Sequence, residues 1–276
     1  MSRDAENNSQ LRFIDSHIHL DFDEFDTIRQ PLMQSLQQAG LVHSLIPGVS
    51  SHRWQKQLRI AKQYQSSYAL GIHPWYCDED WRSEIEELSL LLEQHQKDKR
   101  LVAVGECGLD GLNSNKGRDN GTVWQRQLGC FEAQIQLAKT HHLPLIIHSV
   151  RAHHEVLGLL RQYSPIGGVI HGFYGSVELA EQYLACGFKL GIGHLLLNEQ
   201  AKKLDEVIIK LPLTAFVIET DIALVQQRKQ LQTVNNTDES CSILPLVVEK
   251  IAILQKKSNV LISEQVFQNT VQLFEL

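Results

Sequence analysis

The sequence lacks the features of exported and membrane-spanning proteins. Its five cysteines are scattered and odd in number, and no two of them form a Cys-x-x-Cys pair. This pattern argues against a disulfide framework and against a zinc site built from thiolates. No apolar run approaches the length of a membrane span, and residues 1–10 are polar, without the apolar core of a signal peptide. We therefore expect a cytoplasmic protein with a short disordered leader over residues 1–10.

An excess of basic residues is absent as well. Lys and Arg together number 26 against 32 Asp and Glu, which gives a formal net charge of −6. This balance argues against a broad basic surface for extended nucleic acid. It does not exclude nucleic acid as a substrate, because bound divalent ions could supply positive charge locally.

Short apolar runs alternate with longer helix-patterned stretches over most of the chain. The expected strands cover residues 12–20, 43–47, 68–73, 101–106, 144–148, 168–171, 188–192 and 215–219. The expected helices cover residues 24–38, 51–64, 80–96, 123–141, 153–162, 177–186, 199–210 and 263–274, with one more beginning near residue 242.

This order predicts the fold. A chain of 276 residues can form one barrel-sized domain or two ordinary ones, but no linker or internal repeat divides it. Eight β-then-α units in succession predict the α/β class and a single (β/α)8 TIM barrel over residues 11–276. Residues 223–240 form the longest polar stretch, which we expect to be a loop.

The first expected strand carries Asp15, His17 and His19 at alternate positions. Side chains alternate between the two faces of a strand, so these three project to the same side. Two imidazoles so placed can hold one metal ion through neutral ring nitrogens. A pair of buried, hydrogen-bonded histidines is the alternative for this motif taken alone.

Further residues of the same kind stand at the ends of later strands. In a barrel of this type the active site forms at the carboxyl ends of the strands. The metal-ligand candidates at these ends are His17, His19, Glu106, His148, His171 and Asp221. Any one of them could be structural, but their recurrence at equivalent positions favours a metal site. Imidazole and carboxylate donors without a thiolate suit Zn²⁺, Mn²⁺ or Mg²⁺, and a carboxylate such as Glu106 can bridge two ions.

Six short motifs carry a resemblance to a known family. They cover residues 14–20, 71–74, 105–110, 147–149, 171–173 and 219–221. Each motif is weak alone, but the ordered set is specific and extends over nearly the whole chain. Together they resemble the TatD-type metal-dependent deoxyribonucleases, which belong to the wider amidohydrolase-like barrels.

The resemblance implies a hydrolase of phosphodiester bonds that uses two divalent ions (Mg²⁺, Mn²⁺ or Zn²⁺) and trims DNA from its 3′ end. The implied ligands form two sets that share one carboxylate: His17, His19, Glu106 and Asp221 for one ion, and Glu106, His148 and His171 for the other. Asp221 is also the natural proton acceptor for the attacking water. Asp221 and Glu106 are therefore the expected catalytic residues, and the expected partners are DNA ends or nucleotide-like phosphodiesters, with no obligate protein partner.

Other residues are expected around the metals. His73 could donate a hydrogen bond to a phosphate oxygen, or could simply stabilise its loop beside a proline. Asp15 or Glu219 could accept a hydrogen bond from the second nitrogen of a ligating histidine. Aromatic residues in the expected rim loops could stack on bases or serve as packing: Trp75, Tyr76, Phe173 and Tyr174.

The sequence departs from the family pattern in three places. Ile222 and Ala223 follow Asp221, where a small residue and a proline are usual. Many members have an arginine directly after the serine at 149, whereas here Arg151, a candidate substrate contact, comes one position late. His194 stands where glycine is more usual. These departures bear on substrate range and rate more than on metal binding.

Two alternatives remain. The first is hydrolysis of a C–N or ester bond in a small molecule; relatives with this activity often bridge their metals with a carboxylated lysine at the end of strand four. Glu106 stands there and no lysine lies between residues 101 and 111, which favours phosphodiesters. The second is a non-catalytic barrel that binds metal and a phosphate-bearing partner.

Overall fold

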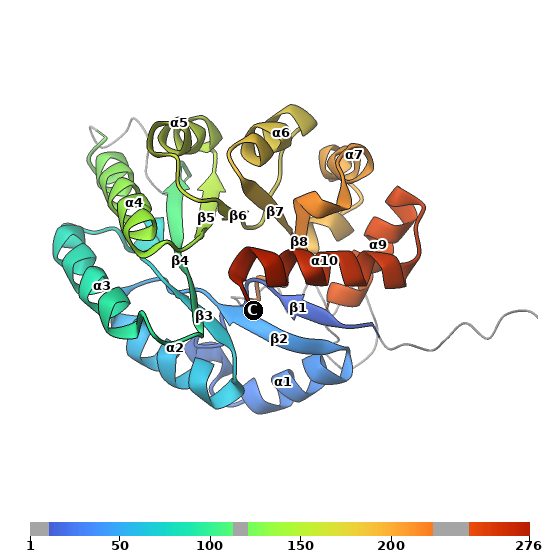
Figure 1. Ribbon diagram of the computed structural model, residues 1–276, viewed down its shortest axis with the longest axis horizontal. Coiled ribbons are helices and arrows are strands. Elements are labelled where there is room, and N and C mark those ends of the chain that lie inside the picture. The colour runs from blue at the N-terminus through green and yellow to red at the C-terminus, as the bar shows by residue number, and fades with distance from the viewer. Residues whose placement is uncertain (1–10, 113–120, 223–242) are drawn as a thin grey trace, which may run out of the picture.

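The computed structural model describes residues 11–112, 121–222 and 243–276. Eight parallel strands form one sheet in sequence order: β1 (Phe13–Asp15), β2 (Leu41–Ile46), β3 (Ser67–Leu70), β4 (Leu101–Asp110), β5 (Leu145–Val150), β6 (Gly168–Ile170), β7 (Phe188–Ile192) and β8 (Phe216–Ile218). The helices outside it are α1 (Arg29–Gln38), α2 (Ser51–Tyr64), α3 (Trp81–His95), α4 (Thr122–His141), α5 (His153–Tyr163), α6 (Val177–Ala185), α7 (Lys202–Lys210), α9 (Leu244–Gln255) and α10 (Asn259–Phe274). Figure 1 shows helices α1 to α7 and α9 around the sheet, with α10 lying across it.

Hydrogen bonds just beyond the carboxyl ends of β1 and β8 bring the two edge strands together. The Ser16 N–H donates to the Ile218 carbonyl at 3.1 Å, and the Asp221 N–H donates to the His17 carbonyl at 2.9 Å. The sheet is thus a nearly closed barrel, and the predicted (β/α)8 TIM barrel is confirmed.

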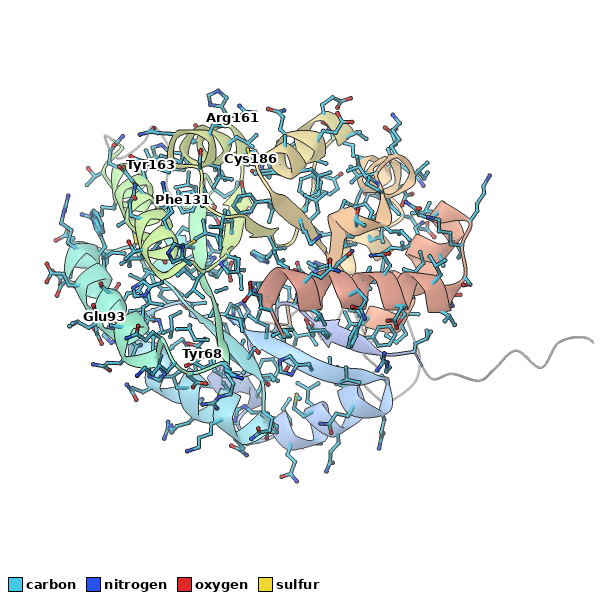
Figure 2. All side chains as sticks on the ribbon, in the orientation of Figure 1. Tyr68, Glu93, Phe131, Arg161, Tyr163 and Cys186 are labelled. Carbon is cyan, nitrogen blue, oxygen red and sulfur yellow. The ribbon has the colours of Figure 1, made fainter. Side chains whose placement is uncertain are left out.

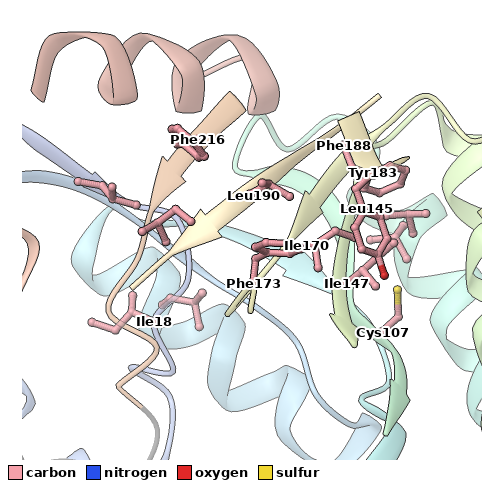
Figure 3. Packing of buried hydrophobic residues seen from close by; sticks show 14 of the residues in the cluster. Ile18, Cys107, Leu145, Ile147, Ile170, Phe173, Tyr183, Phe188, Leu190 and Phe216 are labelled. Atoms are coloured by element: carbon pink, nitrogen blue, oxygen red, sulfur yellow. The ribbon is translucent and has the colours of Figure 1, made fainter. Parts of the chain in front are cut away.

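Two apolar layers stabilise this barrel. Side chains such as Ile146, Val169 and Val217 fill its interior, whereas their neighbours Ile147 and Ile170 belong to the larger cluster that packs against the helices (Figure 3). Strands buried on both faces read as continuous apolar runs, which is why these strands could be recognised in the sequence. On β5, for example, Ile146 fills the interior, and His148, the next residue on the same face, lies at the carboxyl end of the barrel.

The outer helices are amphipathic. Phe131 of α4 is fully buried in the cluster between helices and strands, whereas Glu93 of α3 and Arg161 of α5 lie on the exposed surface (Figure 2). An apolar stripe facing the sheet and charges facing water are typical of the outer helices of such a barrel.

Helix α10 closes the amino-terminal end of the barrel. It lies across β1 and β8 in Figure 1, and its Phe274 packs with the interior side chains. The Asn269 side chain donates to the carbonyls of Leu213 and Phe216, at 2.7 Å each. Because this end is sealed, the carboxyl end is the one available for a site.

Several predicted boundaries were wrong. The helix expected from residue 24 begins only at Arg29, after a separate 3-10 turn η1 (Asp23–Phe25), because Arg29 turns back to the Leu20 carbonyl and Asp26. The helix expected from residue 199 is α7, which begins at Lys202, and the last helix begins at Asn259, where Ser258 caps it by accepting from the Leu261 N–H.

Three strands also differ clearly in length from the prediction. The first strand ends at Asp15, so His17 and His19 follow it and do not lie within it; the third ends at Leu70, before His73. The fourth runs on to Asp110, beyond its expected end at residue 106.

The expected leader over residues 1–10 and the expected loop over residues 223–240 lie outside the described residues. Within the described ranges, no helix has both the length and the apolar character needed to cross a membrane.

Candidate metal centre

Glu106 lies at the centre of the site. It is carried by β4, whose register with β5 shifts between Val104 and Cys107. A local irregularity of this kind re-aims a side chain. The Glu106 N–H donates to the Gly48 carbonyl at 2.7 Å, which ties the irregular segment to the loop after β2. The carboxylate thereby lies inside the barrel mouth, only 2% exposed.

The two carboxylate oxygens of Glu106 face two groups of histidines. Oε2 lies 3.1 Å from His17 Nε2 and 3.4 Å from His19 Nε2. Oε1 lies 3.0 Å from His148 Nδ1 and 2.7 Å from His171 Nε2. A single carboxylate therefore joins two pairs of imidazole nitrogens, which is the arrangement required of a ligand that bridges two ions.

The imidazole nitrogens also converge on one another. The Nε2 atoms of His17 and His19 are 3.2 Å apart, as are His148 Nδ1 and His171 Nε2. The rings of His17 and His171 stack with centroids 4.0 Å apart and so join the two pairs.

Asp221 lies beside the first pair. Its Oδ1 is 3.8 Å from His17 Nε2 and 3.7 Å from His19 Nε2, and its side chain is 22% exposed. The residue has a φ of +49°, a left-handed conformation that is uncommon for a residue with a side chain. Its backbone N–H donates to the His17 carbonyl, which ties this turn to the segment that follows β1. This hydrogen bond positions Asp221 without the proline that is usual in the family pattern.

These donors fit divalent cations. Converging imidazole nitrogens and carboxylate oxygens repel one another unless protons or a cation lie between them. Among the described residues, no lysine or arginine forms an ion pair with Glu106 or Asp221. Hard oxygen and borderline nitrogen donors without a thiolate match Zn²⁺, Mn²⁺ or Mg²⁺. His17, His19 and Asp221 form one compact donor set, and His73, Glu106 and His148 form another.

Burial and neighbouring charges shift the pKa values of the clustered side chains. Burial alone would raise the pKa of Glu106, but the surrounding histidines, above all His171 and His73, hold that pKa well below its usual range. Burial likewise opposes the charge on His171, yet the Glu106 carboxylate raises the pKa of His171 to about 10. Burial together with the charge of His171 lowers the pKa of His17 to about 4. At neutral pH the cluster therefore contains an ionised Glu106, a protonated His171 and a neutral His17.

Asp110 supports this site, a role that sequence reasoning missed. Its Oδ2 lies 3.2 Å from His148 Nε2, so it can accept a hydrogen bond from the nitrogen opposite the one that faces Glu106. The same oxygen accepts from Trp75 Nε1 at 2.7 Å. Asp110 closes the 105–110 motif, and extending the fourth strand to that residue would have placed it beside the strand that carries His148.

Glu219 and Asp15 occupy different environments. Glu219 Oε1 accepts from the Gly172 N–H and lies 3.8 Å from His171 Nδ1. Gly191 makes room for this carboxylate, since a Cβ there would lie 2.3 Å from Glu219 Oε2. Asp15 instead accepts from the backbone N–H of His17 at 3.2 Å and from Thr220 N and Oγ1 at 3.0 and 2.5 Å. Asp15 therefore orders the backbone beneath the site and faces no histidine ring nitrogen among the described residues.

The two expected substrate contacts are placed differently. His73 is buried, accepts from the Trp75 N–H through Nδ1 at 3.1 Å, and points Nε2 at Glu106 Oε1 across 3.2 Å. It therefore joins the cluster directly. Arg151 is exposed with a φ of +49°, and within the described ranges it forms no ion pair with the cluster.

A small pocket opens beside Asp221 and Glu219, between the ends of β6, β7 and β8. Its other lining residues are Gly172, Phe173, Gly193, His194 and Leu195. His194, which begins the 3-10 turn η3 (His194–Leu197), thus faces an opening next to the cluster.

Comparison with known proteins places this geometry in a family. The family model described as "TatD related DNase" matches residues 14–275. An "Uncharacterized metal-dependent hydrolase YjjV" from Escherichia coli is 31% identical over 96% of this chain and 98% of its own. A "3'-5' ssDNA/RNA exonuclease TatD" from Pantoea sp. is 28% identical over 95% of this chain and 99% of its own.

Solved structures agree with the sequence matches. The crystal structure of YjjV, a TatD homologue from Escherichia coli, superimposes with a TM-score of 0.82 at 30% identity, and covers 96% of this chain and 99% of that one. A TatD family hydrolase from Entamoeba histolytica shares the fold with a TM-score of 0.78 at 20% identity, over 96% of this chain and 98% of its own. With its barrel and clustered candidate ligands, this chain belongs to the TatD family of metal-dependent hydrolases.

Proposed function

We propose that this hydrolase cleaves phosphodiester bonds and trims single-stranded DNA from its 3′ end with the help of two divalent ions. The observation that carries the proposal is the position of Glu106, whose two oxygens face separate pairs of histidines. The exonuclease name of relatives that match nearly the whole chain supports the substrate class.

The ions would be held by the cluster's own donors. His17, His19 and Asp221 would bind one ion, His148 and His171 the other, and Glu106 both. When bound, two such ions polarise phosphate oxygens and lower the pKa of a nearby water.

The protein's own residues supply the rest of the chemistry. The Asp221 side chain is 22% exposed whereas that of Glu106 is 2% exposed, so Asp221 is the carboxylate that a solvent water can reach. We assign it the role of proton acceptor, worth about 10²- to 10⁴-fold in rate for a positioned general base. His73 Nε2–H donates to Glu106 Oε1. When substrate binds, a phosphate oxygen would accept this hydrogen bond in place of Glu106. Arg151, exposed after β5, would contact a phosphate farther along the strand.

The test is a turnover assay. Metal-defined protein is incubated with 5′-labelled single-stranded DNA, with and without Mg²⁺, Mn²⁺ or Zn²⁺. A ladder that shortens from the 3′ end, only with metal, is expected. Asp221→Asn should slow it about 10²- to 10⁴-fold, and Asp205→Asn, on the outer helix α7, should not.

Equal activity in both variants would show that Asp221 is not the base. Hydrolysis of small esters or amides without any cleavage of DNA would move the function to the small-molecule class. Metal binding with neither activity would point to a non-catalytic barrel.

A further inference from the structure

One tryptophan differs from the other three in its exposure. Trp54, Trp81 and Trp124 are buried within the helix-packed layer, whereas Trp75 is 56% exposed. It lies in the 3-10 turn η2 (Pro74–Tyr76), directly after the segment that brings His73 into the cluster. Packing accounts for only part of the surface of this residue, and an exposed aromatic ring beside a polar site is a candidate binding surface.

The indole of Trp75 is held in position. Its Nε1–H donates to Asp110 Oδ2 at 2.7 Å, and Asp110 is itself buried. Its backbone N–H donates to His73 Nδ1 at 3.1 Å, and its ring meets the His73 ring edge-on, with centroids 5.0 Å apart. These contacts fix the ring, while more than half of the surface of the residue remains open to solvent. A ring that is ordered beforehand loses little conformational entropy when a ligand stacks on it.

The ring is close to the metal ligands. Its centroid is 6.3 Å from that of the His148 ring, and both rings are tied to the same Asp110 oxygen. Stacked nucleotides in a strand rise about 3.4 Å per step, so this spacing is less than two steps. A phosphate bound beside His148 would place an adjoining base within reach of the Trp75 ring.

We propose that Trp75 is a stacking subsite for the nucleobase next to the cleaved phosphate. This inference rests on the proposed function and adds a determinant of substrate recognition to it. A flat aromatic face accepts any base, because every base has a π face. Stacking also suits a protein of net charge −6, since it gives affinity without a basic groove.

The test uses short oligothymidylates that carry either thymidine or an abasic tetrahydrofuran unit at the 3′ terminus. Binding is measured with Mg²⁺ on the Asp221→Asn protein, which slows turnover. The tryptophan fluorescence of this protein should be quenched by the thymidine oligomer, because Trp75 is the exposed indole. Loss of the terminal base should weaken binding about 5- to 150-fold, the range measured for base–aromatic stacking.

Variants separate stacking from a structural role. Adding Trp75→Ala should make the two oligomers bind equally, whereas Trp75→Phe, which keeps the ring and loses the bond to Asp110, should keep the preference. Tyr163→Ala removes an aromatic ring from the carboxyl end of the outer helix α5, away from the cluster, and should leave the preference unchanged. Equal preference in the Trp75→Ala and parent proteins would overturn the inference, as would a Trp75→Phe protein that behaves like Trp75→Ala.

The outcomes also separate this inference from the proposed function. Cleavage of DNA without a preference for the terminal base would leave the nuclease and remove the subsite. Base-dependent binding to Trp75 without cleavage in the unmutated protein would keep the subsite and remove the nuclease.

Discussion

Asp110 connects a metal-ligand candidate to the surface of the protein. Its side chain lies 3.2 Å from His148 Nε2 and accepts from Trp75 Nε1 at 2.7 Å. A ligating histidine depends on such an acceptor for the orientation of its ring and for its basicity. The position of Trp75 at the rim and the donor strength of His148 are therefore set by one carboxylate.

The Asp110→Asn variant tests this connection. We expect it to bind divalent metal about 10- to 100-fold more weakly, the usual cost of losing an outer carboxylate. Isothermal titration with Mn²⁺ measures the change. Asp98→Asn is the matched control, because Asp98 pairs with Arg100 away from the cluster. Unchanged affinity in Asp110→Asn would show that His148 needs no help from this carboxylate.

Metal binding should also release protons. In the metal-free cluster the Glu106 carboxylate overcomes burial and raises the pKa of His171 to about 10, so His171 is protonated at neutral pH. A ligand nitrogen must be neutral, so an ion has to displace that proton. Affinity should rise with pH, by about tenfold per pH unit for each proton released.

Titrations at one pH in two buffers of different ionisation enthalpy measure the release directly. The two apparent enthalpies should differ by an amount that His171→Gln reduces. Equal enthalpies in both buffers would mean that no proton leaves, contrary to the raised pKa of His171.

Residue identity could be read from the sequence better than residue contacts. The ligand candidates could be recognised because imidazole and carboxylate residues follow the apolar runs, and the structure brings all six together. Alternation along the first strand was a poorer guide, because His17 and His19 lie beyond its end. The hydrogen-bond partner of Asp15 could not be predicted from the sequence. Thr220 lies 205 positions away and contacts Asp15 only when β1 and β8 close the barrel.

At the scale of elements, buried glutamines tie helices to the strands that carry the site. Gln134 of α4 accepts from the Ile72 N–H at 2.8 Å and donates to the Ile72 carbonyl at 3.0 Å. These bonds satisfy the backbone beyond the end of β3, where the chain leaves the sheet and leads to His73. Each such group would otherwise be buried without a partner.

Gln134→Leu should destabilise the fold. It has a similar volume but leaves the N–H and C=O of Ile72 without the amide, at about 1–3 kcal/mol for each unsatisfied group. Urea denaturation should show a free energy of unfolding lower by at least about 2 kcal/mol in total. Gln136→Leu, on the exposed side of the same helix, should change it by less than about 0.5 kcal/mol. Similar free energies of unfolding for both variants would show that the hydrogen bonds between Gln134 and Ile72 do not stabilise the fold.

Element types were predictable where burial dictates composition. The eight strands are apolar because both faces are covered, and the sequence shows them all. Boundaries were less accessible where tertiary contacts decide them. Arg29 begins α1 while hydrogen bonding to Leu20 and Asp26, and no local pattern signals that contact.

At the scale of the whole molecule, the acidic balance limits how nucleic acid can bind. With a net charge of −6, affinity should come from bound ions and from stacking, with direct contact to about one or two phosphates. Binding of a short single strand should then weaken less than about tenfold between 50 and 200 mM salt. Fluorescence anisotropy at several salt concentrations measures the slope. A loss of about 10³-fold would reveal a cationic surface that this account lacks.

The architecture of the barrel explains why the candidate metal site lies at its carboxyl end. Helix α10 seals the amino-terminal end, and the inward positions beyond the apolar interior bring Glu106 and the histidines to the other end. The sealing contacts of Asn269 could not be predicted, because an asparagine in a helix carries no local sign of the carbonyls that it will meet.

The central claim is that these side chains hold two divalent ions with Glu106 between them. Crystals grown with Mn²⁺ and measured for anomalous scattering test it most directly. We expect two peaks, one beside His17, His19 and Asp221 and one beside His148 and His171, both within bonding distance of Glu106. A site with no anomalous peak, or with ions bound away from Glu106, would contradict the account.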